Sequence, residues 1–336
     1  MIGVIEFITL LCGIVVSFFS EDLFDIWNDE NGLVNWPTAL TKDVLPVPCH
    51  SHNDYTRPMP LVSALKAGCV GVEADVWLID EELYIAHTRP KVTHGRTLGS
   101  LYVNPLMSLL EERNSAINQT LHGVFETDPD QNLVLLIDFK TNGADTLPYV
   151  ISHLSPLRDR GYLTHWNGAK VVNRPITVVA TGSAPFELLT ANSTYRDIFY
   201  DAPLELMEDG EPKPVQRARS ARRKEEGQGS SGTPSAVHLG TYNPSNSYYA
   251  SGSYDRSIRF PWKFYITSNQ LNRIRAQINE AHRRGLKVRY WSTPSWPRNL
   301  RNHIWSVLVR EGADLLNVDD LESAIKGHWW SNNEGR

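Results

Sequence analysis

Short apolar segments alternate with helix-like segments along most of this chain, and this alternation limits the possible folds more than any other feature. The apolar segments have the length and composition of buried strands. Eight of them lie at residues 44–49, 70–77, 133–139, 176–181, 198–203, 247–254, 288–294 and 313–320. Amphipathic, helix-like stretches lie between several of these strands, at 60–68, 147–161 and 271–285.

Strands with continuous apolar sequence, separated by helices, are typical of a parallel sheet that is covered on both faces. Eight such strands between residues 38 and 330 favour an α/β fold, a TIM (β/α)8 barrel. An open, doubly wound sheet is the alternative fold. No GxGxxG or P-loop sequence follows the first strand, which removes the main reason to prefer the open sheet. We therefore predict a single barrel domain over residues 38–330.

The charge of the chain gives no sign of a nucleic-acid partner. Its formal net charge is −5, and the single basic cluster is RARSARRK at 217–224. That cluster lies within residues 205–236, a stretch poor in apolar residues and rich in Gly, Pro, Ser and charged residues. This composition is typical of disorder, so we predict a disordered insertion in the barrel domain at 205–236.

The N-terminal segment has the length and apolar character of a membrane-targeting sequence. Residues 1–19 are nearly all apolar, with an interruption at Glu6. They lack a positively charged start and a small-x-small cleavage site, so residues 1–20 fit a signal anchor better than a removed signal peptide. A globular helix is the alternative. Glycosylation sequons begin at Asn118 and Asn192. We expect membrane association through this segment, or entry to the secretory pathway, with a lumenal or extracellular catalytic domain.

The chain has three cysteines, Cys12, Cys49 and Cys69, too few for a disulfide-dense scaffold. Cys12 belongs to the apolar N-terminal segment. Cys49 and Cys69 could form one bridge or remain buried thiols, and we expect the buried thiols.

Polar residues gather at the predicted carboxyl ends of the strands, where the active-site residues of a TIM barrel lie. The first strand ends in CHSHND at 49–54, and the second carries Glu73 and Asp75. The third ends in DFK at 138–140, and the eighth ends in NVDD at 317–320. Acids that merely face solvent would not be expected at equivalent places on several strands.

Glu73 and Asp75 lie two residues apart on one strand, so their side chains point the same way. Paired carboxylates in a partly buried place repel unless a proton, a cationic partner or a metal ion compensates them. Asp138 adds a third carboxylate, and oxygen ligands suit Mg²⁺, with Ca²⁺ as a further possibility. Lys140 shares the face of Asp138, where its ammonium could bind phosphate or pair with the acids.

Two histidines are suited to proton transfer near neutral pH. His50 ends the first strand. His87 follows Asp75 through a short strand–turn–strand sequence, IDEELYIAH at 79–87, which can return it to the same end of the barrel. A histidine at a strand end is more often structural than catalytic. We infer a catalytic role for His50 and His87 because both are predicted to lie at the same end of the barrel as the acids.

Seven motifs together are characteristic of one protein family. They are HSHNDY (50–55), VEADVWL (72–78), LYIAH (83–87), RTLGSLYVNPL (96–106), LLIDFKT (135–141), RYWSTP (289–294) and LLNVDDLESA (315–324). Through them the chain resembles the fungal altered inheritance of mitochondria protein 6 family over residues 44–325. This family belongs to the phospholipase-C-like phosphodiesterase superfamily, with the glycerophosphodiester phosphodiesterases and the sphingomyelinase D enzymes. The resemblance implies a TIM barrel with metal-dependent phosphodiester chemistry.

The resemblance also implies roles for the matching residues. His50 and His87 would be the catalytic acid and base. The implied metal ligands are Glu73, Asp75 and Asp138. Lys140 would lie near the phosphate, and Trp291 would line the substrate pocket, as in the sphingomyelinase D branch.

Two sequences depart from the related enzymes. Glycerophosphodiesterases carry H-R-G after the first strand and H-D after the second, whereas this chain has His50-Ser51-His52 and His87-Thr88. A glycerophosphodiester substrate is therefore less well supported, and His52 competes with His50 for the catalytic role. Asn53 matches the sphingomyelinase D pattern, which favours His50. We expect His52 and Asn53 to contact substrate.

These observations predict a Mg²⁺-dependent phosphoric diester hydrolase or lyase that acts on a phospholipid or lysophospholipid headgroup. The rival prediction is a catalytically silent lipid- or glycan-binding barrel. Metal-dependent hydrolysis of carboxylic esters or amides is less favoured, because Lys140 suits phosphate and no G-x-S-x-G sequence is present.

Overall fold

The computed structural model describes residues 38–115, 121–207, 241–261, 265–327 and 329. The predicted signal anchor at 1–20 and the sequon at Asn118 lie outside the described residues. Within the described residues, no helix combines the length and the apolar composition that a membrane crossing requires. The targeting of the chain therefore stays a prediction.

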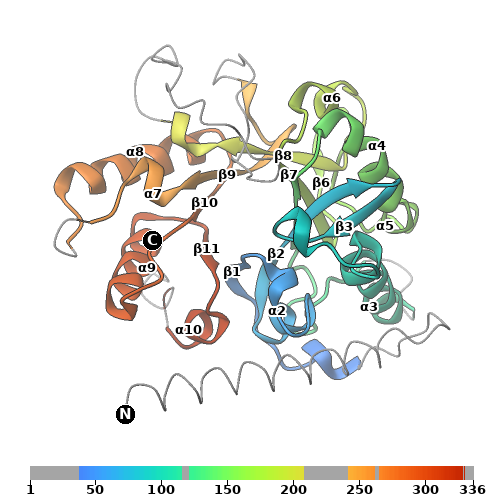
Figure 1. The fold of residues 1–336 in the computed structure, drawn as a ribbon, viewed down its shortest axis with the longest axis horizontal. Helices are drawn as coiled ribbons and strands as arrows, with labels where there is room; N and C mark the ends of the chain where they lie inside the picture. Colours follow the sequence, from blue (N-terminus) through green and yellow to red (C-terminus); the bar gives the residue numbers. More distant parts are fainter. Residues whose placement is uncertain (1–37, 116–120, 208–240, 262–264, 328, 330–336) are drawn as a thin grey trace.

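Eight parallel strands form a closed barrel, which confirms the predicted TIM-barrel fold and excludes the open sheet. The strands are β1 (Val47–Ser51), β2 (Cys69–Ile79), β4 (Leu133–Phe139), β7 (Ile176–Gly182), β8 (Ile198–Pro203), β9 (Ser247–Ser253), β10 (Lys287–Trp291) and β11 (Leu315–Val318). Each pairs in parallel with the next, and β1 pairs with both β2 and β11, which closes the sheet. Figure 1 shows these strands as a ring with the helices outside it.

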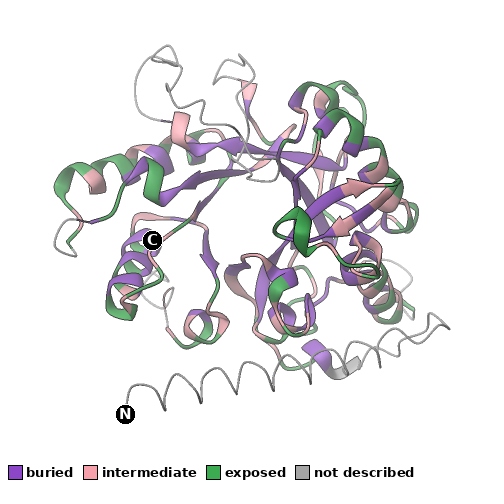
Figure 2. Cartoon of the chain, in the orientation of Figure 1, coloured by how far each residue is buried: buried purple, intermediate pink, exposed green. Residues whose placement is uncertain are grey.

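Helices on the outside of the ring cover the strands. They are α2 (Val62–Lys66), α3 (Asn104–Asn114), α4 (Gly143–His153), α5 (Ser155–Asp159), α6 (Phe186–Thr190), α7 (Tyr254–Ser257), α8 (Ser268–Arg283), α9 (Arg298–Glu311) and α10 (Leu321–Lys326). Figure 2 shows the consequence, with buried strands and with helices whose outer faces are exposed. All seven residues of β4, LVLLIDF, are buried, as expected of a strand that has side chains in the barrel interior and others beneath the helices.

Shorter elements complete the described fold. They are the 3-10 turns η1 (Thr38–Thr41), η2 (Asp54–Thr56), η3 (Arg89–Lys91) and η5 (Leu204–Leu206), the π-helical turn η4 (Gly99–Val103), and the strands β3 (Glu82–Ile85), β5 (His165–Trp166) and β6 (Val171–Val172). Local sequence explains several helix ends. Thr267 and Gln270 form a capping box at the start of α8, and Gly312 ends α9 in the left-handed region.

The predicted insertion at 205–236 lies mostly outside the described residues, which exclude 208–240. Its first residues belong to the described fold, because η5 includes Glu205 and Met207 is buried. The Glu205 carboxylate accepts a hydrogen bond of 2.9 Å from the backbone of Ser253, at the end of β9. These residues therefore pack against the carboxyl end of the barrel.

Cys49 and Cys69 form a disulfide, so the expectation of two buried thiols is wrong. Cys49 lies in β1 and Cys69 begins β2, the neighbouring parallel strand. Their Cα atoms are 4.7 Å apart, within the range that a disulfide bridges. The two cysteines are 20 residues apart, on consecutive strands of the barrel. Consecutive parallel strands are neighbours in such a barrel, so this spacing was the signal that could have revealed the bridge.

Candidate active site

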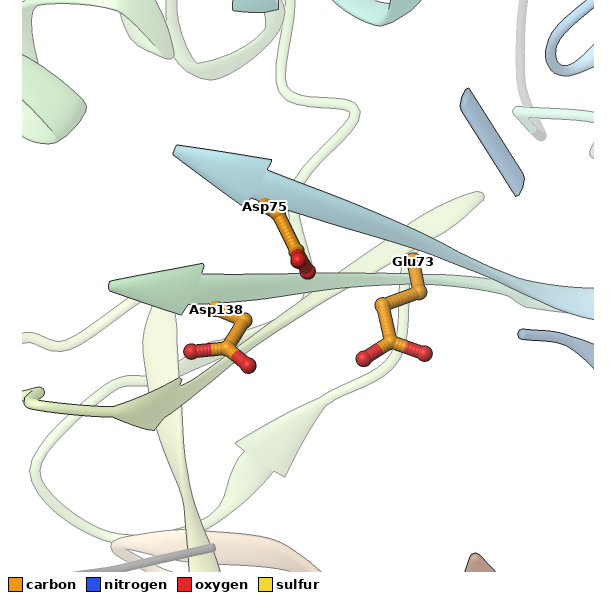
Figure 3. A group of neighbouring side chains, drawn as sticks. All are labelled: Glu73, Asp75 and Asp138. Atoms are coloured by element: carbon orange, nitrogen blue, oxygen red, sulfur yellow. The ribbon is translucent and has the colours of Figure 1, made fainter. Parts of the chain in front are cut away.

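Three buried carboxylates from two neighbouring strands form the centre of the candidate site. Glu73 and Asp75 come from β2 and Asp138 comes from β4, where Asp75 and Asp138 are direct partners in the strand register. One oxygen atom from each carboxylate lies within 4.8 Å of the other two. Figure 3 shows the three side chains projecting to the same side of the two strands. The structure thus brings together all three predicted metal ligands.

Lys140 lies against two of these carboxylates. Its Nζ atom is 2.6 Å from Asp138 Oδ2 and 3.0 Å from Asp75 Oδ2, and the side chain is buried. Burial disfavours its charged form, but Asp138 and Asp75 outweigh this effect and raise the pKa of Lys140. Burial raises the pKa of Asp138 to about 6, although Lys140 opposes the shift. The ammonium therefore pairs with the acids, as one of the two predicted roles of Lys140 required.

The carboxylate cluster fits a hard divalent cation. Three carboxylates and one ammonium leave an excess of negative charge in a buried place, which is costly without further compensation. Asp75 Oδ1 and Asp138 Oδ1 are buried and have no hydrogen-bond partner among the described residues. Oxygen donors of this kind are those that Mg²⁺ and Ca²⁺ prefer. The cluster could hold a metal ion, with Glu73, Asp75 and Asp138 as its protein ligands.

His50 lies beside Glu73 and is fully buried near the end of β1. Its Nε2 atom is 4.0 Å from Glu73 Oε2. Burial, then the charges of Arg289 and His52, hold the pKa of His50 well below its usual value, so the ring is neutral. Gly71 on β2 provides the room for this ring, because a Cβ atom there would lie 2.3 Å from His50 Nδ1.

His52 approaches the same carboxylate from the partly exposed side. Its Nε2 atom is also 4.0 Å from Glu73 Oε2, and its Nδ1 atom is 2.8 Å from Asp319 Oδ1. Although burial disfavours the charged ring, Glu73 and Asp319 raise the pKa of His52. Arg57 donates a hydrogen bond of 2.9 Å to the carbonyl of Asp319. Asp319, held in this way after β11, orients His52 so that Nε2 faces the cluster.

His87 reaches the site through a hairpin. β2 extends beyond the barrel to Ile79 and pairs with β3 in antiparallel fashion, which returns the chain toward the strand ends. The half-exposed His87 has its Nδ1 atom 3.5 Å from Asp75 Oδ2 and 3.3 Å from the hydroxyl of Tyr55. The hairpin therefore places His87 beside Asp75, whereas His50 and His52 approach Glu73.

Tyr55 and Asn53 hold the carboxylates from the loop after β1. The Tyr55 hydroxyl is 2.7 Å from Asp75 Oδ2 and 2.8 Å from Asn53 Oδ1. Asn53 adopts a left-handed conformation, and its backbone N–H donates a hydrogen bond of 3.3 Å to Glu73 Oε2. Burial and the charge of Asp75 raise the pKa of Tyr55, so its hydroxyl remains a donor. Asn53 is predicted to contact substrate, and in the structure it also contacts Tyr55 and Glu73 of the site.

Comparisons with known proteins identify the family of this chain. A family model described as "AIM6-like phosphodiesterase domain" matches residues 38–201, which include every predicted histidine and metal ligand. The altered inheritance of mitochondria protein 6 homolog of Arthroderma benhamiae is 36% identical over 94% of both chains. The chain belongs to the altered inheritance of mitochondria protein 6 family.

Two further proteins are similar to this chain. The family member of Lachancea thermotolerans is 35% identical over 85% of this chain and 66% of its own length. A solved glycerophosphodiester phosphodiesterase from Parabacteroides distasonis covers 87% of this chain and 100% of its own, with 13% identity and a TM-score of 0.42. The TIM-barrel fold of this chain is assigned from its own strand order.

Sequence reasoning missed a second buried cation in this member of the altered inheritance of mitochondria protein 6 family. Arg289 on β10 donates hydrogen bonds to Asn317 (2.7 Å) and Ser251 (3.1 Å). Its guanidinium also lies 3.8 Å from both Glu73 Oε2 and Asp201 Oδ2. Arg289 and Asp201 are charged residues inside apolar strands, and that placement was the available signal.

Trp291 ends the same strand and is half-buried. The guanidinium of Arg256, in α7 after β9, lies 4.8 Å from the centre of its ring. The predicted pocket residue thus lies at the carboxyl end of β10, at the same end of the barrel as the carboxylates.

Proposed function

We propose that this protein is a metal-dependent phosphodiesterase, a phosphoric diester hydrolase or lyase that cleaves a phospholipid or lysophospholipid headgroup. The observation that carries the proposal is the buried cluster of Glu73, Asp75 and Asp138 with the ammonium of Lys140 against it. His50 and His52 approach Glu73 of this cluster, and His87 approaches Asp75. The match to a phosphodiesterase domain model gives independent support for the class of reaction.

The roles of the side chains follow from their positions. A bound Mg²⁺ would supply a positive charge for the phosphoryl oxygens. Lys140 adds a second positive charge beside it and attracts the phosphate. His50, neutral and buried, can accept a proton from the attacking hydroxyl, with His52 as the competing acceptor. His87, half-exposed beside Asp75, can deliver a proton to the leaving oxygen. Tyr55 holds Asp75 through its hydroxyl.

The lipid nature of the substrate is supported by the sequence outside the barrel. Residues 1–19 are nearly all apolar, and we propose that they hold the domain at a membrane in the secretory pathway. A domain at a membrane meets phosphodiesters in lipid headgroups at high local concentration. Trp291, half-buried at the carboxyl end of β10, supplies an aromatic surface for the substrate.

One observation favours the rival function, a silent lipid- or glycan-binding barrel. The ammonium of Lys140 already contacts Asp75 and Asp138, so these two carboxylates are partly compensated without a metal ion. A site that only binds a ligand would need no positive charge beyond the Lys140 ammonium. The two functions differ in their need for Mg²⁺.

The test is hydrolysis of lysophospholipids with choline, ethanolamine, inositol and glycerol headgroups, in Mg²⁺ and in EDTA. The Asp75→Asn variant removes one proposed ligand, and Asp130→Asn, an exposed acid just before β4, is its matched control. We expect turnover of at least one headgroup that EDTA abolishes, a loss of about a thousandfold in Asp75→Asn, and none in Asp130→Asn.

Full turnover in EDTA, or a fully active and folded Asp75→Asn protein, would contradict the metal assignment. A folded parent protein that turns over none of the headgroups would favour the silent barrel.

A further inference from the structure

Exposed aromatic side chains gather on two loops at the carboxyl end of the barrel. Trp296 and Tyr265 are the most exposed large apolar side chains in the described part of the chain, at 77% and 75%. Phe260 is 55% exposed. Trp296 lies between β10 and α9, whereas Phe260 and Tyr265 lie between α7, which follows β9, and α8.

These two loops leave the barrel side by side. β9 and β10 are neighbouring parallel strands whose last residues, Ser253 and Trp291, are partners in the register. The contact between Arg256 and the Trp291 ring links the two loops directly. The carboxylate cluster lies at the carboxyl ends of β2 and β4, so the aromatic side chains and the candidate site share one end of the barrel.

Basic side chains accompany the aromatic ones. Arg259 precedes Phe260 and Arg298 begins α9, and both are exposed. Arg89 and Lys91, in η3 just after His87, are exposed beyond the hairpin. Beside Arg259 and Arg298, Asp255 in α7 is an exposed acid, and Glu205 is paired with Arg256 at 3.5 Å. The exposed acids Asp80 and Glu81 lie on the hairpin that precedes Arg89 and Lys91. Phe260, Tyr265 and Trp296, together with Arg259 and Arg298, form the mouth rim.

Aromatic and basic side chains together fit one kind of partner best. Exposed apolar surface is unfavourable in water unless a partner covers it. Tryptophan and tyrosine favour the headgroup level of a bilayer, because their rings are apolar and their tips are polar. Arginine side chains at that level are attracted by anionic headgroups. Separate, highly exposed side chains on two loops suit a soft lipid surface.

We propose that the mouth rim inserts into the headgroup layer of an anionic bilayer and turns the strand ends toward it. The purpose of this contact rests on the proposed function: a phospholipid substrate that stays in the membrane would then lie opposite the carboxylates. The contact itself requires no catalysis.

The experiment is hydrogen–deuterium exchange on the full chain with two kinds of vesicle. One is phosphatidylcholine alone, and in the other a third of the lipid is phosphatidylserine. The observed segments are residues 265–267 and 292–296. The reference segments are residues 284–286 and 312–314, which follow the far ends of the same two helices, α8 and α9.

We expect anionic vesicles to slow exchange in both rim segments by about threefold or more, and to leave both reference segments unchanged. Phosphatidylcholine vesicles should give a smaller effect. Substitution of both Trp296→Ala and Phe260→Ala should abolish the slowing. The control is Leu45→Ala, which removes a side chain that is 72% exposed just before β1, at the opposite end of the barrel. This control should keep the slowing.

Unchanged exchange in both rim segments would overturn the proposal. Slowing that persists in the double variant would also overturn it. Turnover of a short-chain, monomeric lysophospholipid is measured in parallel. Slower exchange in the rim segments without turnover would support the membrane contact and count against the phosphodiesterase. Turnover without slower exchange would support the phosphodiesterase and count against the membrane contact.

Discussion

Two walls of the barrel each contribute one buried cation, and each cation lies near two buried carboxylates, but at different distances. On the wall of β2 and β4, the ammonium of Lys140 contacts Asp138 at 2.6 Å and Asp75 at 3.0 Å. On the wall of β8 to β10, the guanidinium of Arg289 stays 3.8 Å from both Asp201 and Glu73. Arg289 instead directs its short hydrogen bonds to two neutral side chains, Ser251 and Asn317.

The difference indicates which wall can exchange its counter-ion. A lysine ammonium is a compact charge on a flexible stem, so it can move away from a carboxylate when a metal ion or a phosphate arrives. The guanidinium of Arg289 is fixed by hydrogen bonds on two neighbouring strands and is always charged. The first wall is therefore suited to chemistry, and the second gives the barrel interior a permanent positive charge beneath Glu73.

The largest expected effect separates these two cations. Arg289→Met leaves Asp201 buried without its cation, and we expect the free energy of unfolding to fall by about 3 kcal/mol. Mg²⁺ should not restore this loss. Lys140→Met should also destabilise the metal-free protein, but saturating Mg²⁺ should restore its stability, because a metal ion can compensate Asp75 and Asp138. Urea unfolding with and without Mg²⁺ measures both responses. If the two variants respond alike to Mg²⁺, the comparison fails.

A smaller effect is expected from substitution of a glycine near Asp138, and a glycine on β9 provides the control. Gly182 has φ +69°, and a Cβ atom there would lie 2.0 Å from Asp138 Oδ1. Gly182→Ala should therefore displace that carboxylate and weaken Mg²⁺ binding by about thirtyfold, or ~2 kcal/mol. Gly252→Ala on β9 is the control, since its nearest contact would be Leu204 Cβ at 3.2 Å. Titration calorimetry measures both affinities, and equal affinities would remove Gly182 from the site.

The smallest effect is a dependence of Mg²⁺ affinity on pH. The pKa of Asp138 in the metal-free protein is raised by burial to about 6. Below this value the carboxyl group is protonated, so metal binding must release its proton. The affinity should fall about tenfold for each pH unit below 6 and become nearly constant above it. Titrations one unit below and one unit above that value give the slope, and a flat profile would exclude Asp138 as a ligand.

Much of the fold could be predicted because burial dictates the sequence of the strands. LVLLIDF at 133–139 and IFYDAP at 198–203 coincide with β4 and β8. The alternation of side chains predicted that Glu73 and Asp75 share a face, and the equivalence of strand ends predicted that Asp138 joins them. Neither inference needed any knowledge of the strand register.

The remainder depends on contacts that only barrel closure creates. Arg289 meets Glu73 across the barrel interior, and His52 meets Asp319 only because β1 pairs with β11. The Cys49–Cys69 bridge likewise requires β1 beside β2. Tyr55 lies within the motif HSHNDY, but its contact with Asp75 depends on the turn after β1. No local pattern contains such information, since it arises from the positions of residues far apart in the chain.

The measurement that tests the central claim most directly is a calorimetric titration of the metal-free protein with Mg²⁺, beside the Asp138→Asn variant. We predict one Mg²⁺ bound per chain in the parent protein, and no measurable binding in a variant that remains folded. A folded parent protein that binds no Mg²⁺, or an Asp138→Asn protein that binds it with the same affinity, would contradict the account.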